Sequence, residues 1–465
     1  MRGTEVLKPL EKALQMNLDP TKYGTFAEIG AGQEVSNWFF RAGASNGTVA
    51  KTISAYGMTM SDAIYGSGVR YVSRARLEAM LDHEFDIVCD RLDDERGEDT
   101  TFFSFCDTVR ARGYNDTDNS ECFGWMGIRF RTEPRGPAHD ILIHARLLDP
   151  DNTDQMDCLG ILGVNLIHGA FFRRNNLADF IKGLLDNLSR RRAEIDMLKF
   201  SGPEFEKIDN RTCALLLVEH GLTDAALFSP NGEVMQSAEI FYGKPIFCMR
   251  GSFNPVTRVN LDMMESGTKT FAEDLKKEGS DRDPLDVVEI TVNNLLGGVG
   301  ELDTEDFLAR ADVLQQLGKT VLVSNFAEFH QLGQFFARYT KEPVGIILGT
   351  GLLEAIFQEK WYEGLDGGIL ESFGRLFKHS SRLYIYPTIN SASQTMKLAN
   401  NAEIAPHLQH LFDHLLTNGF IREIPDCLKE CALRSSADIR QLIEDKDPEW
   451  KELVPPVVLE HPRWK

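Results

Sequence analysis

The chain has 465 residues, of which 42% are hydrophobic and 26% charged, a composition that excludes a disordered or fibrous protein. Its 70 acidic and 50 basic residues give a formal net charge of -20, which opposes attraction to nucleic acids and to anionic membrane surfaces. At about 150 residues per domain, this length predicts two or three domains.

The cysteines and the apolar segments bear on where the protein works. Eight cysteines are scattered through a long chain, which predicts reduced thiols in a cytoplasmic protein. Cys427 and Cys431 are close together, but a single C-x3-C pair is weak evidence for zinc. Residues 1–17 lack the apolar core of a signal peptide, and the longest apolar stretch, 158–172, is too short to span a bilayer. We expect no membrane association.

The first 175 residues carry patterns that predict an α+β domain with an antiparallel sheet. Apolar residues at helical spacing predict an amphipathic helix over 74–94. Strand-like runs follow at 101–110, 123–132, 140–148 and 159–172. The Pro-Arg-Gly-Pro turn between the second and third of these runs predicts an antiparallel pair. A helix over 177–192 is expected to lead out of the domain.

From about residue 193 to residue 400, short apolar runs alternate with helical patterns, which predicts a mostly parallel α/β domain. The expected strands lie at 194–200, 224–228, 245–249, 285–292, 320–324, 344–348 and 383–386. The expected helices lie at 261–277, 304–317 and 327–339. The spacing fits a doubly wound sheet or a barrel-like closure, and periodicity does not distinguish them.

Residues 401–465 are predicted to form C-terminal helices, one of them over 405–416, followed by an extended arm over 454–459. The arm contains two consecutive prolines, which favour an extended backbone. Together with Trp450 and Trp464, it suggests packing across a neighbouring subunit. We therefore expect a homo-oligomer.

Polar residues cluster where the predicted parallel strands end, which is where open α/β sheets bind ligands. Residues 244–255 combine a buried strand with a tight turn, and a helix begins a few residues later. Backbone amides in such a turn and at a helix N-terminus can hold a phosphate, and arginines can add positive charge. The residues expected to contact the anion here are Arg250, Gly251, Ser252, Asn254 and Arg258.

A second turn, Gly349-Thr350-Gly351, follows the strand predicted at 344–348 and precedes another apolar run. Its amides could hold an anion in the same way. Glycine, asparagine and proline also serve simply to turn the chain at the end of a strand, so a structural role stays the alternative for both turns.

Residues 251–257, Gly-Ser-Phe-Asn-Pro-Val-Thr, match in order the start of the pattern G-S-F-[DN]-P-[VI]-[HT]-x-G-H. The segment resembles the nucleotidyltransferase superfamily that includes the nicotinate and nicotinamide mononucleotide adenylyltransferases. The resemblance implies binding of ATP with Mg²⁺ and adenylyl transfer, with Thr257 and Asn260 as candidate catalytic residues. Val259 replaces the family's glycine, and Asn260 replaces its phosphate-contacting histidine.

Residues 389–395 loosely match the family's second signature, I-S-S-T-x-x-R, and Lys397 lies one place away from the position of its arginine. The first signature normally opens its fold, whereas about two predicted β/α units precede it here. The chain as a whole also resembles a family of bacterial proteins of similar length.

Residues 28–32, Glu-Ile-Gly-Ala-Gly, resemble the first motif of S-adenosylmethionine-dependent methyltransferases, with Glu34 in place of the third glycine. That resemblance implies parallel β/α units directly after the motif, whereas the strands predicted there are antiparallel. The alternative is a turn into a helix that carries Val35, Trp38 and Phe39.

Three histidines, His407, His410 and His414, fall within about 60° of one another on a predicted helix, since successive residues turn by about 100°. They are the candidate metal ligands. Their arc flanks an apolar stripe, so packing at the edge of the helix or a subunit contact is the alternative.

Three functions stay open at this point. The first is a nucleotide- or phosphate-binding protein, with nucleotidyltransferase-like activity in an altered site. The second is a non-catalytic ligand-binding or scaffold protein, and the third is a methyltransferase. The acidic net charge beside local arginines favours a small phosphorylated ligand over DNA or RNA.

Overall fold

The computed structural model describes residues 6–68, 70–116, 121–296, 302–389, 396–428 and 436–464. The chain divides into two compact units, Met1–Ala226 and Leu227–Lys465. This division falls later than the boundary predicted between residues 175 and 193, because one more strand and one more helix belong to the first unit. None of the helices in the described part of the chain is long and apolar enough to cross a membrane.

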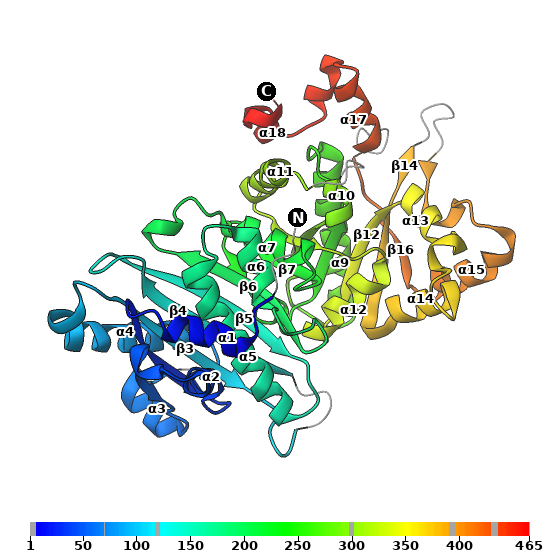
Figure 1. Cartoon of the computed structure of the whole chain (residues 1–465). Coiled ribbons are helices and arrows are strands. Elements are labelled where there is room, and N and C mark those ends of the chain that lie inside the picture. The colour runs from blue at the N-terminus through cyan, green and yellow to red at the C-terminus, as the bar shows by residue number, and fades with distance from the viewer. Residues whose placement is uncertain are drawn as a thin grey trace. The chain divides into compact units, whose positions relative to one another are not determined.

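The first unit contains a six-stranded mixed sheet in the order β2-β1-β3-β4-β5-β6 (Figure 1). Its strands are β1 (Lys22–Ile29), β2 (Val49–Ile53), β3 (Thr101–Arg110), β4 (Cys122–Arg131), β5 (Ala138–Leu147) and β6 (Ala193–Ser201). β1 pairs in parallel with β2 and β3, whereas β3 to β6 pair antiparallel. The predicted antiparallel pairing of the runs at 123–132 and 140–148 is confirmed.

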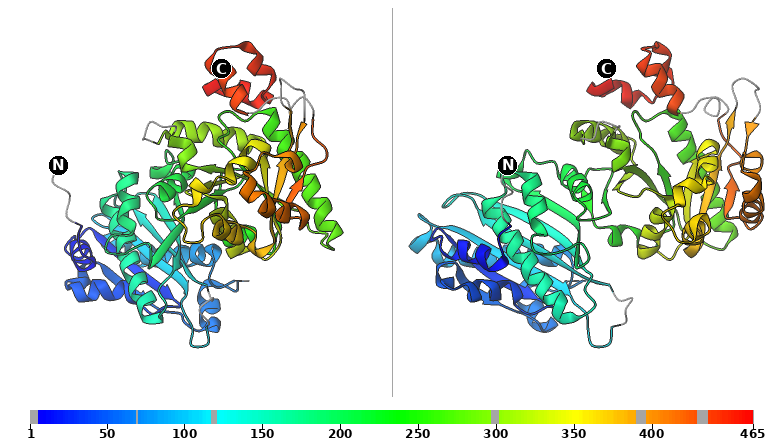
Figure 2. Two further views of the ribbon diagram at one scale, coloured as in Figure 1. Left: turned by 90° about the vertical axis from the view of Figure 1, so that its right-hand side faces the viewer. Right: turned by 45° about the vertical axis from the view of Figure 1, so that its right-hand side comes forward.

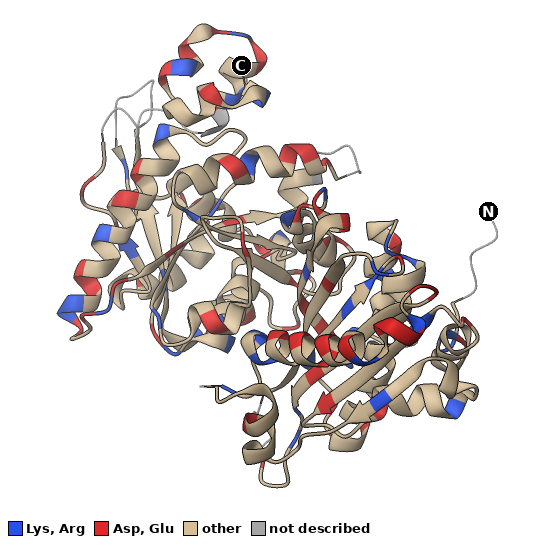
Figure 3. Cartoon of the chain, turned by 90° about the vertical axis from the view of Figure 1, so that its left-hand side faces the viewer, with Lys and Arg blue, Asp and Glu red and all other residues tan. Residues whose placement is uncertain are grey.

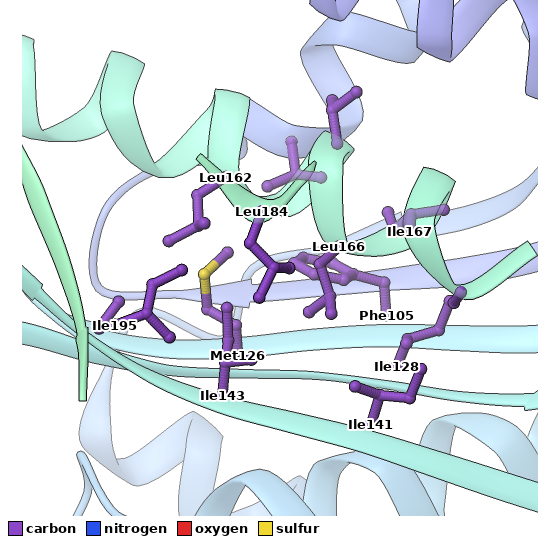
Figure 4. Close-up of a cluster of buried hydrophobic side chains, with 14 of the residues drawn as sticks. Phe105, Met126, Ile128, Ile141, Ile143, Leu162, Leu166, Ile167, Leu184 and Ile195 are labelled. Atoms are coloured by element: carbon purple, nitrogen blue, oxygen red, sulfur yellow. The ribbon is translucent and has the colours of Figure 1, made fainter. Parts of the chain in front are cut away.

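Helices cover both faces of this sheet. They are α1 (Pro9–Asn17), α2 (Glu34–Ala42), α3 (Met58–Tyr65), α4 (Arg74–Arg96), α5 (Asn152–Phe172), α6 (Leu177–Leu184) and α7 (Asn210–Glu219). Figure 4 shows Phe105, Met126 and Ile143 of the strands beside Leu162 and Leu166 of α5 in the main core. On the other face, Phe85 and Val88 of α4 pack against Phe102. The helix predicted over 74–94 is therefore confirmed.

Three expectations for this region are wrong. Residues 159–172 form most of helix α5 and not a strand, because a continuous apolar run also suits a helix buried on all sides. Gly163 lets α5 lie close to α2, since a Cβ there would come within 2.3 Å of Val35 Cγ2. The helix predicted over 177–192 ends at Leu184. The run at 194–200 is β6, an antiparallel neighbour of β5 and not the first strand of the parallel sheet.

The second unit is built around an open sheet in the order β16-β13-β12-β9-β10-β11-β7-β8. The strands are β7 (Ala225–Phe228), β8 (Val234–Met235), β9 (Ile246–Arg250), β10 (Leu285–Thr291), β11 (Thr320–Ser324), β12 (Val344–Gly349), β13 (Ser381–Tyr386) and β16 (Ile421–Glu423), and β14 (Thr388–Ile389) pairs separately with β15 (Met396–Lys397). The pairings from β16 through β13, β12, β9 and β10 to β11 are parallel. The protein is thus α+β followed by α/β, and the parallel sheet does not close into a barrel.

Most helices of the second unit lie on the two faces of its sheet, and the last two lie beyond one end of its strands (Figure 2). They are α8 (Ser237–Phe241), α9 (Arg258–Lys277), α10 (Val292–Leu296), α11 (Thr304–Gln316), α12 (Phe329–Tyr339), α13 (Thr350–Ile356), α14 (Gly368–Leu376), α15 (Gln409–Thr417), α17 (Ser436–Glu444) and α18 (Pro456–Glu460). Phe271 of α9 stacks on Phe247 of β9, with ring centroids 5.4 Å apart. Arg250 of β9 points to the face of the sheet opposite α9, where its guanidinium lies over the ring of Phe329 of α12. The sheet is therefore doubly wound.

The C-terminal region differs from the prediction at its end. The helix predicted over 405–416 corresponds to a short 3-10 turn, Pro406–Leu408, followed by α15. The expected extended arm over 454–459 is wrong, because its second proline begins helix α18, a position that proline favours. Val454 and Val458 are buried within the chain. The homo-oligomer stays a prediction.

Candidate functional site

The order of the strands in the second unit creates a point where the chain reverses its direction across the sheet. From β9 the chain proceeds through β10 to β11, then returns to place β12 on the other side of β9. In doubly wound sheets, ligands bind beyond the carboxyl ends of the two strands that flank such a reversal. Here those ends are Arg250 of β9 and Gly349 of β12, which are the starts of the two turns singled out in the sequence.

A cavity of about 260 Å³ lies at this position. Its lining residues are Met249, Arg250, Gly251, Ser252, Phe253, Asn254, Pro255, Val259, Asn260, Met263, Gly349, Tyr386, Thr388 and Arg440. The structure therefore brings together four of the five residues predicted in the first turn with one residue of the second turn. Of the second turn, Gly349 lines this cavity, whereas Thr350 and Gly351 do not.

The cavity differs in charge from the rest of the chain. Figure 3 shows Asp and Glu spread over both units, in keeping with the net charge of -20. The lining residues that the structure describes include two arginines and no carboxylate. A compact anion would thus meet a locally basic wall in an acidic protein.

Arg250 holds its place through a buried ion pair. Its Nε and Nη2 atoms donate to the two carboxylate oxygens of Glu289 on β10, at 2.8 and 3.0 Å, and Nη1 donates to the Ala327 carbonyl at 3.2 Å. The side chain of Arg250 is 10% exposed and that of Glu289 is fully buried. Ser324 Oγ donates to the same carboxylate at 2.5 Å. The charge of Arg250 is therefore compensated inside the protein.

The turn after β9 is held by its neighbours. The Gly251 amide donates to the Glu289 carbonyl at 3.0 Å, and Arg310 Nη1 of α11 donates to the Ser252 carbonyl at 2.9 Å. Phe253 has a φ of +48°, a left-handed conformation that is uncommon outside glycine and asparagine. Ser252 Oγ accepts from Arg440 Nη1 of α17 at 2.5 Å. This network presents the Ser252 hydroxyl at the cavity wall in a defined position.

The two candidate catalytic residues cap helix α9. The Asn260 amide donates to Thr257 Oγ1 at 3.3 Å, and the Thr257 amide donates to Asn260 Oδ1 at 3.0 Å, which completes a capping box. Asn260 lines the cavity and Thr257 does not. The capping role explains both residue types without any catalysis.

Arg258 does not reach the cavity, contrary to its predicted role as a second cation. Its amide donates to the Leu453 carbonyl at 2.9 Å and its Nε donates to the Val454 carbonyl at 3.4 Å, so Arg258 holds the C-terminal segment. Gly351 lies inside helix α13. The Thr350 hydroxyl is hydrogen-bonded to the Thr388 hydroxyl. Of these two residues, Thr388 lines the cavity.

Sequence reasoning missed Tyr386, Thr388 and Arg440. Tyr386 lies opposite Gly349 in the sheet, so its place at the carboxyl end of β13 could have identified it. Its hydroxyl donates a hydrogen bond to Asp262 of α9. Arg440 lies on a C-terminal helix almost 200 residues after the turn that it contacts, and no local pattern marks it.

The three histidines do not form a metal site. All three are exposed, and His407 Nε2 lies 2.8 Å from Glu359 Oε2. Over the described ranges, no group of three or more His, Cys, Asp or Glu side chains is arranged to hold a metal ion. Cys431 and the residues 390–395 of the second nucleotidyltransferase signature lie outside the described residues. Lys397 pairs with Glu354 at 2.7 Å.

The methyltransferase-like motif forms the turn from β1 into α2. The buried Glu28 carboxylate accepts from the Val35 and Ser36 amides at 2.9 and 3.0 Å, as expected for a turn into a helix. β1 and β2 are nevertheless parallel, so a β/α unit does follow the motif. Burial raises the pKa of Glu28, and burial together with Glu28 raises the pKa of Asp107, which lies opposite it on β3.

The second unit thus belongs to the class of doubly wound α/β folds with a cavity at the reversal point. No protein-family model matches the sequence, and no curated protein matches it. Part of the chain is similar to the competence/damage inducible protein CihA from Agrobacterium tumefaciens, with 13% identity and a TM-score of 0.26 over 35% of this chain and 96% of that one.

A competence-damaged protein (CinA) superfamily protein from Enterobacter cloacae gives 12% identity and a TM-score of 0.27, over 37% of this chain and 96% of that one. A competence or damage-inducible protein from Enterobacter asburiae gives 13% identity and a TM-score of 0.26, over 35% of this chain and 95% of that one.

Proposed function

We propose that the second unit binds a small phosphorylated molecule in the cavity between the ends of β9 and β12. The observation that carries the proposal is the lining itself: a glycine-containing turn at the reversal point, with arginines as its charged side chains and no carboxylate among its described residues. Ser252, Asn254 and Asn260 add neutral hydrogen-bonding groups.

The size and the walls of the cavity favour a small ligand. Its volume of about 260 Å³ lies just below the range of about 300–1,000 Å³ usual for drug-sized ligands. Met249, Val259 and Met263 form apolar wall that suits a nucleobase or another ring. The net charge of -20 repels a nucleic acid at long range, whereas a compact anion can enter.

Adenylyl transfer is a second hypothesis, because residues 251–255 of the nucleotidyltransferase-like signature all line the cavity. The resemblance implies Mg²⁺, which prefers carboxylate and water oxygens. The described lining residues offer no carboxylate, so they do not fit a protein-held Mg²⁺. For this reason we place binding before catalysis.

Binding is tested by thermal unfolding with a panel of probes at millimolar concentration: inorganic phosphate, pyrophosphate, AMP, ATP, NAD, ribose 5-phosphate and S-adenosylmethionine, with adenosine as the uncharged control. A ligand at 100 times its Kd stabilises by about 2.7 kcal/mol. We expect phosphorylated probes to raise the Tm and adenosine to leave it unchanged. The proposal fails if no phosphorylated probe raises the Tm.

Two variants connect the effect to the cavity. Asn254→Ala removes a neutral lining group and is expected to reduce the shift. Arg338→Ala removes an exposed arginine of the same unit that does not line the cavity, and is expected to leave the shift unchanged. For the second hypothesis, ATP and magnesium are incubated with nicotinamide mononucleotide, and absence of pyrophosphate release rejects adenylyl transfer.

A further inference from the structure

The two arginines that line the cavity differ in what they are bonded to. Arg250 is engaged by the Glu289 carboxylate and by the Ala327 carbonyl, so its charge is already balanced. Arg440 is exposed, and the partner that the structure gives it is the neutral hydroxyl of Ser252. A phosphate in the cavity would therefore find its counter-charge on Arg440 and not on Arg250.

We propose that Arg440 is the residue that selects an anionic ligand in this cavity, and that the C-terminal segment, residues 438–464, completes the site by delivering it. This inference rests on the function proposed above. On binding, the ligand's phosphate oxygen replaces Ser252 Oγ as the acceptor from the guanidinium, so that the charged donor gains a charged acceptor in place of a neutral one. Arg440 is thus a binding residue contributed by the far end of the chain.

The C-terminal segment docks where the parallel strands end, and Figures 1 and 2 show α17 and α18 on that side of the second unit. Its backbone accepts two hydrogen bonds from Arg258, through the Leu453 and Val454 carbonyls. Val454 is 1% exposed and Val458 is fully buried, so the segment is anchored by apolar contacts as well.

An ion pair and a histidine–aspartate contact join the end of the segment to α11. Arg463 Nη2 lies 2.8 Å from Asp306 Oδ1, and His461 Nε2 lies 3.6 Å from Asp312 Oδ2. Asp306 also pairs with Arg310, which donates to the Ser252 carbonyl. The segment therefore reaches the Ser252 turn by two routes: directly through Arg440, and indirectly through Arg463, Asp306 and Arg310.

This arrangement predicts reciprocal coupling between ligand binding and docking of the segment. If docking of the segment raises the affinity for an anion by some factor, a bound anion must shift the docking equilibrium toward the docked state by the same factor. Arg258, predicted as a direct anion ligand, acts in this scheme as a positioning residue, because it holds the segment and does not line the cavity.

The test measures affinities for pyrophosphate and AMP by calorimetry in the full-length chain. Arg440→Gln is expected to weaken binding about 10-fold to 100-fold, the range for losing a hydrogen bond to a charged group. Arg440→Lys is expected to lose less, because it keeps the charge. Arg338→Gln is the matched control and is expected to bind as the wild type does. The Tm of each variant without ligand verifies that it is folded.

Arg463→Gln tests the docking step without changing the cavity lining. We expect it to weaken pyrophosphate binding and to speed proteolytic cleavage within 438–464, and we expect pyrophosphate to slow that cleavage in the wild type. If the wild type binds these probes and Arg440→Gln binds them with the same affinity, this inference is wrong and the proposed function stands. Absence of binding of every phosphorylated probe to the wild type overturns both.

Discussion

The buried ion pair beside the cavity offers a sharp test of how charge is arranged there. Glu289→Gln would remove the negative partner of Arg250 while keeping nearly the same side-chain volume. One amide oxygen remains to accept from the guanidinium and from Ser324 Oγ, in place of two carboxylate oxygens. Arg250 would then carry an unbalanced charge that is only 10% exposed.

Breaking a buried pair by removing one partner costs about 3–5 kcal/mol, because the remaining charge stays buried. Arg250 keeps its bond to the Ala327 carbonyl and its contact with the Phe329 ring, whose centroid lies 4.5 Å from Cζ. We therefore expect the lower end, about 3 kcal/mol of lost unfolding free energy. The matched control is Glu342→Gln, which breaks the exposed pair with Arg282 and should cost less than about 1 kcal/mol.

The assay is urea unfolding followed by circular dichroism, with and without millimolar pyrophosphate. Because Arg250 lines the cavity, an anion can neutralise it once Glu289 is gone. Pyrophosphate should therefore restore more stability to Glu289→Gln than it adds to the wild type. A loss no larger than that of the control, or an equal effect of pyrophosphate on both proteins, would refute the reasoning.

Two further predictions concern backbone space and buried charge. Gly251→Ala should cost about 1–3 kcal/mol of unfolding free energy, because the new Cβ would lie 2.9 Å from the Phe253 ring. Gly349→Ala is the control and should leave the Tm unchanged, because no atom lies within 4 Å of its Cβ position. Equal shifts of the Tm in the two variants would contradict this reasoning. The pKa of Glu28 is raised from 4.5 to about 7 by burial, so the folded state holds a proton that the unfolded chain releases, and stability should fall as pH rises through this window. That loss amounts to about 3 kcal/mol. Urea titrations at pH 5 and pH 8 should show a smaller loss in Asp107→Asn, because burial and Glu28 raise the pKa of Asp107 too, so that its carboxyl also holds a proton in the folded state. An unchanged loss in this variant would contradict the expectation.

The sequence determined the elements whose signals are local. Strand runs bounded by turn residues predicted β9 to β13 within a residue or two, and the Pro-Arg-Gly-Pro turn predicted the pairing of β4 with β5. The turn at 251–255 was found for the same reason: its glycine, asparagine and proline follow directly after a buried strand. Such features depend on neighbouring residues and on little else.

Tertiary structure decided everything that depends on which segments meet. β6 has the apolar pattern of a buried strand in either sheet, and only its pairing with β5 assigns it to the first unit. The apolar run of α5 fits a strand or a helix until Gly160 and Gly163 are seen to face α2. Arg250 seemed free in the sequence because Glu289 lies 39 residues away, and Arg440 was missed because its partner Ser252 lies 188 residues away. The charge of a site is the sum over side chains that folding brings together, and no local pattern contains that sum.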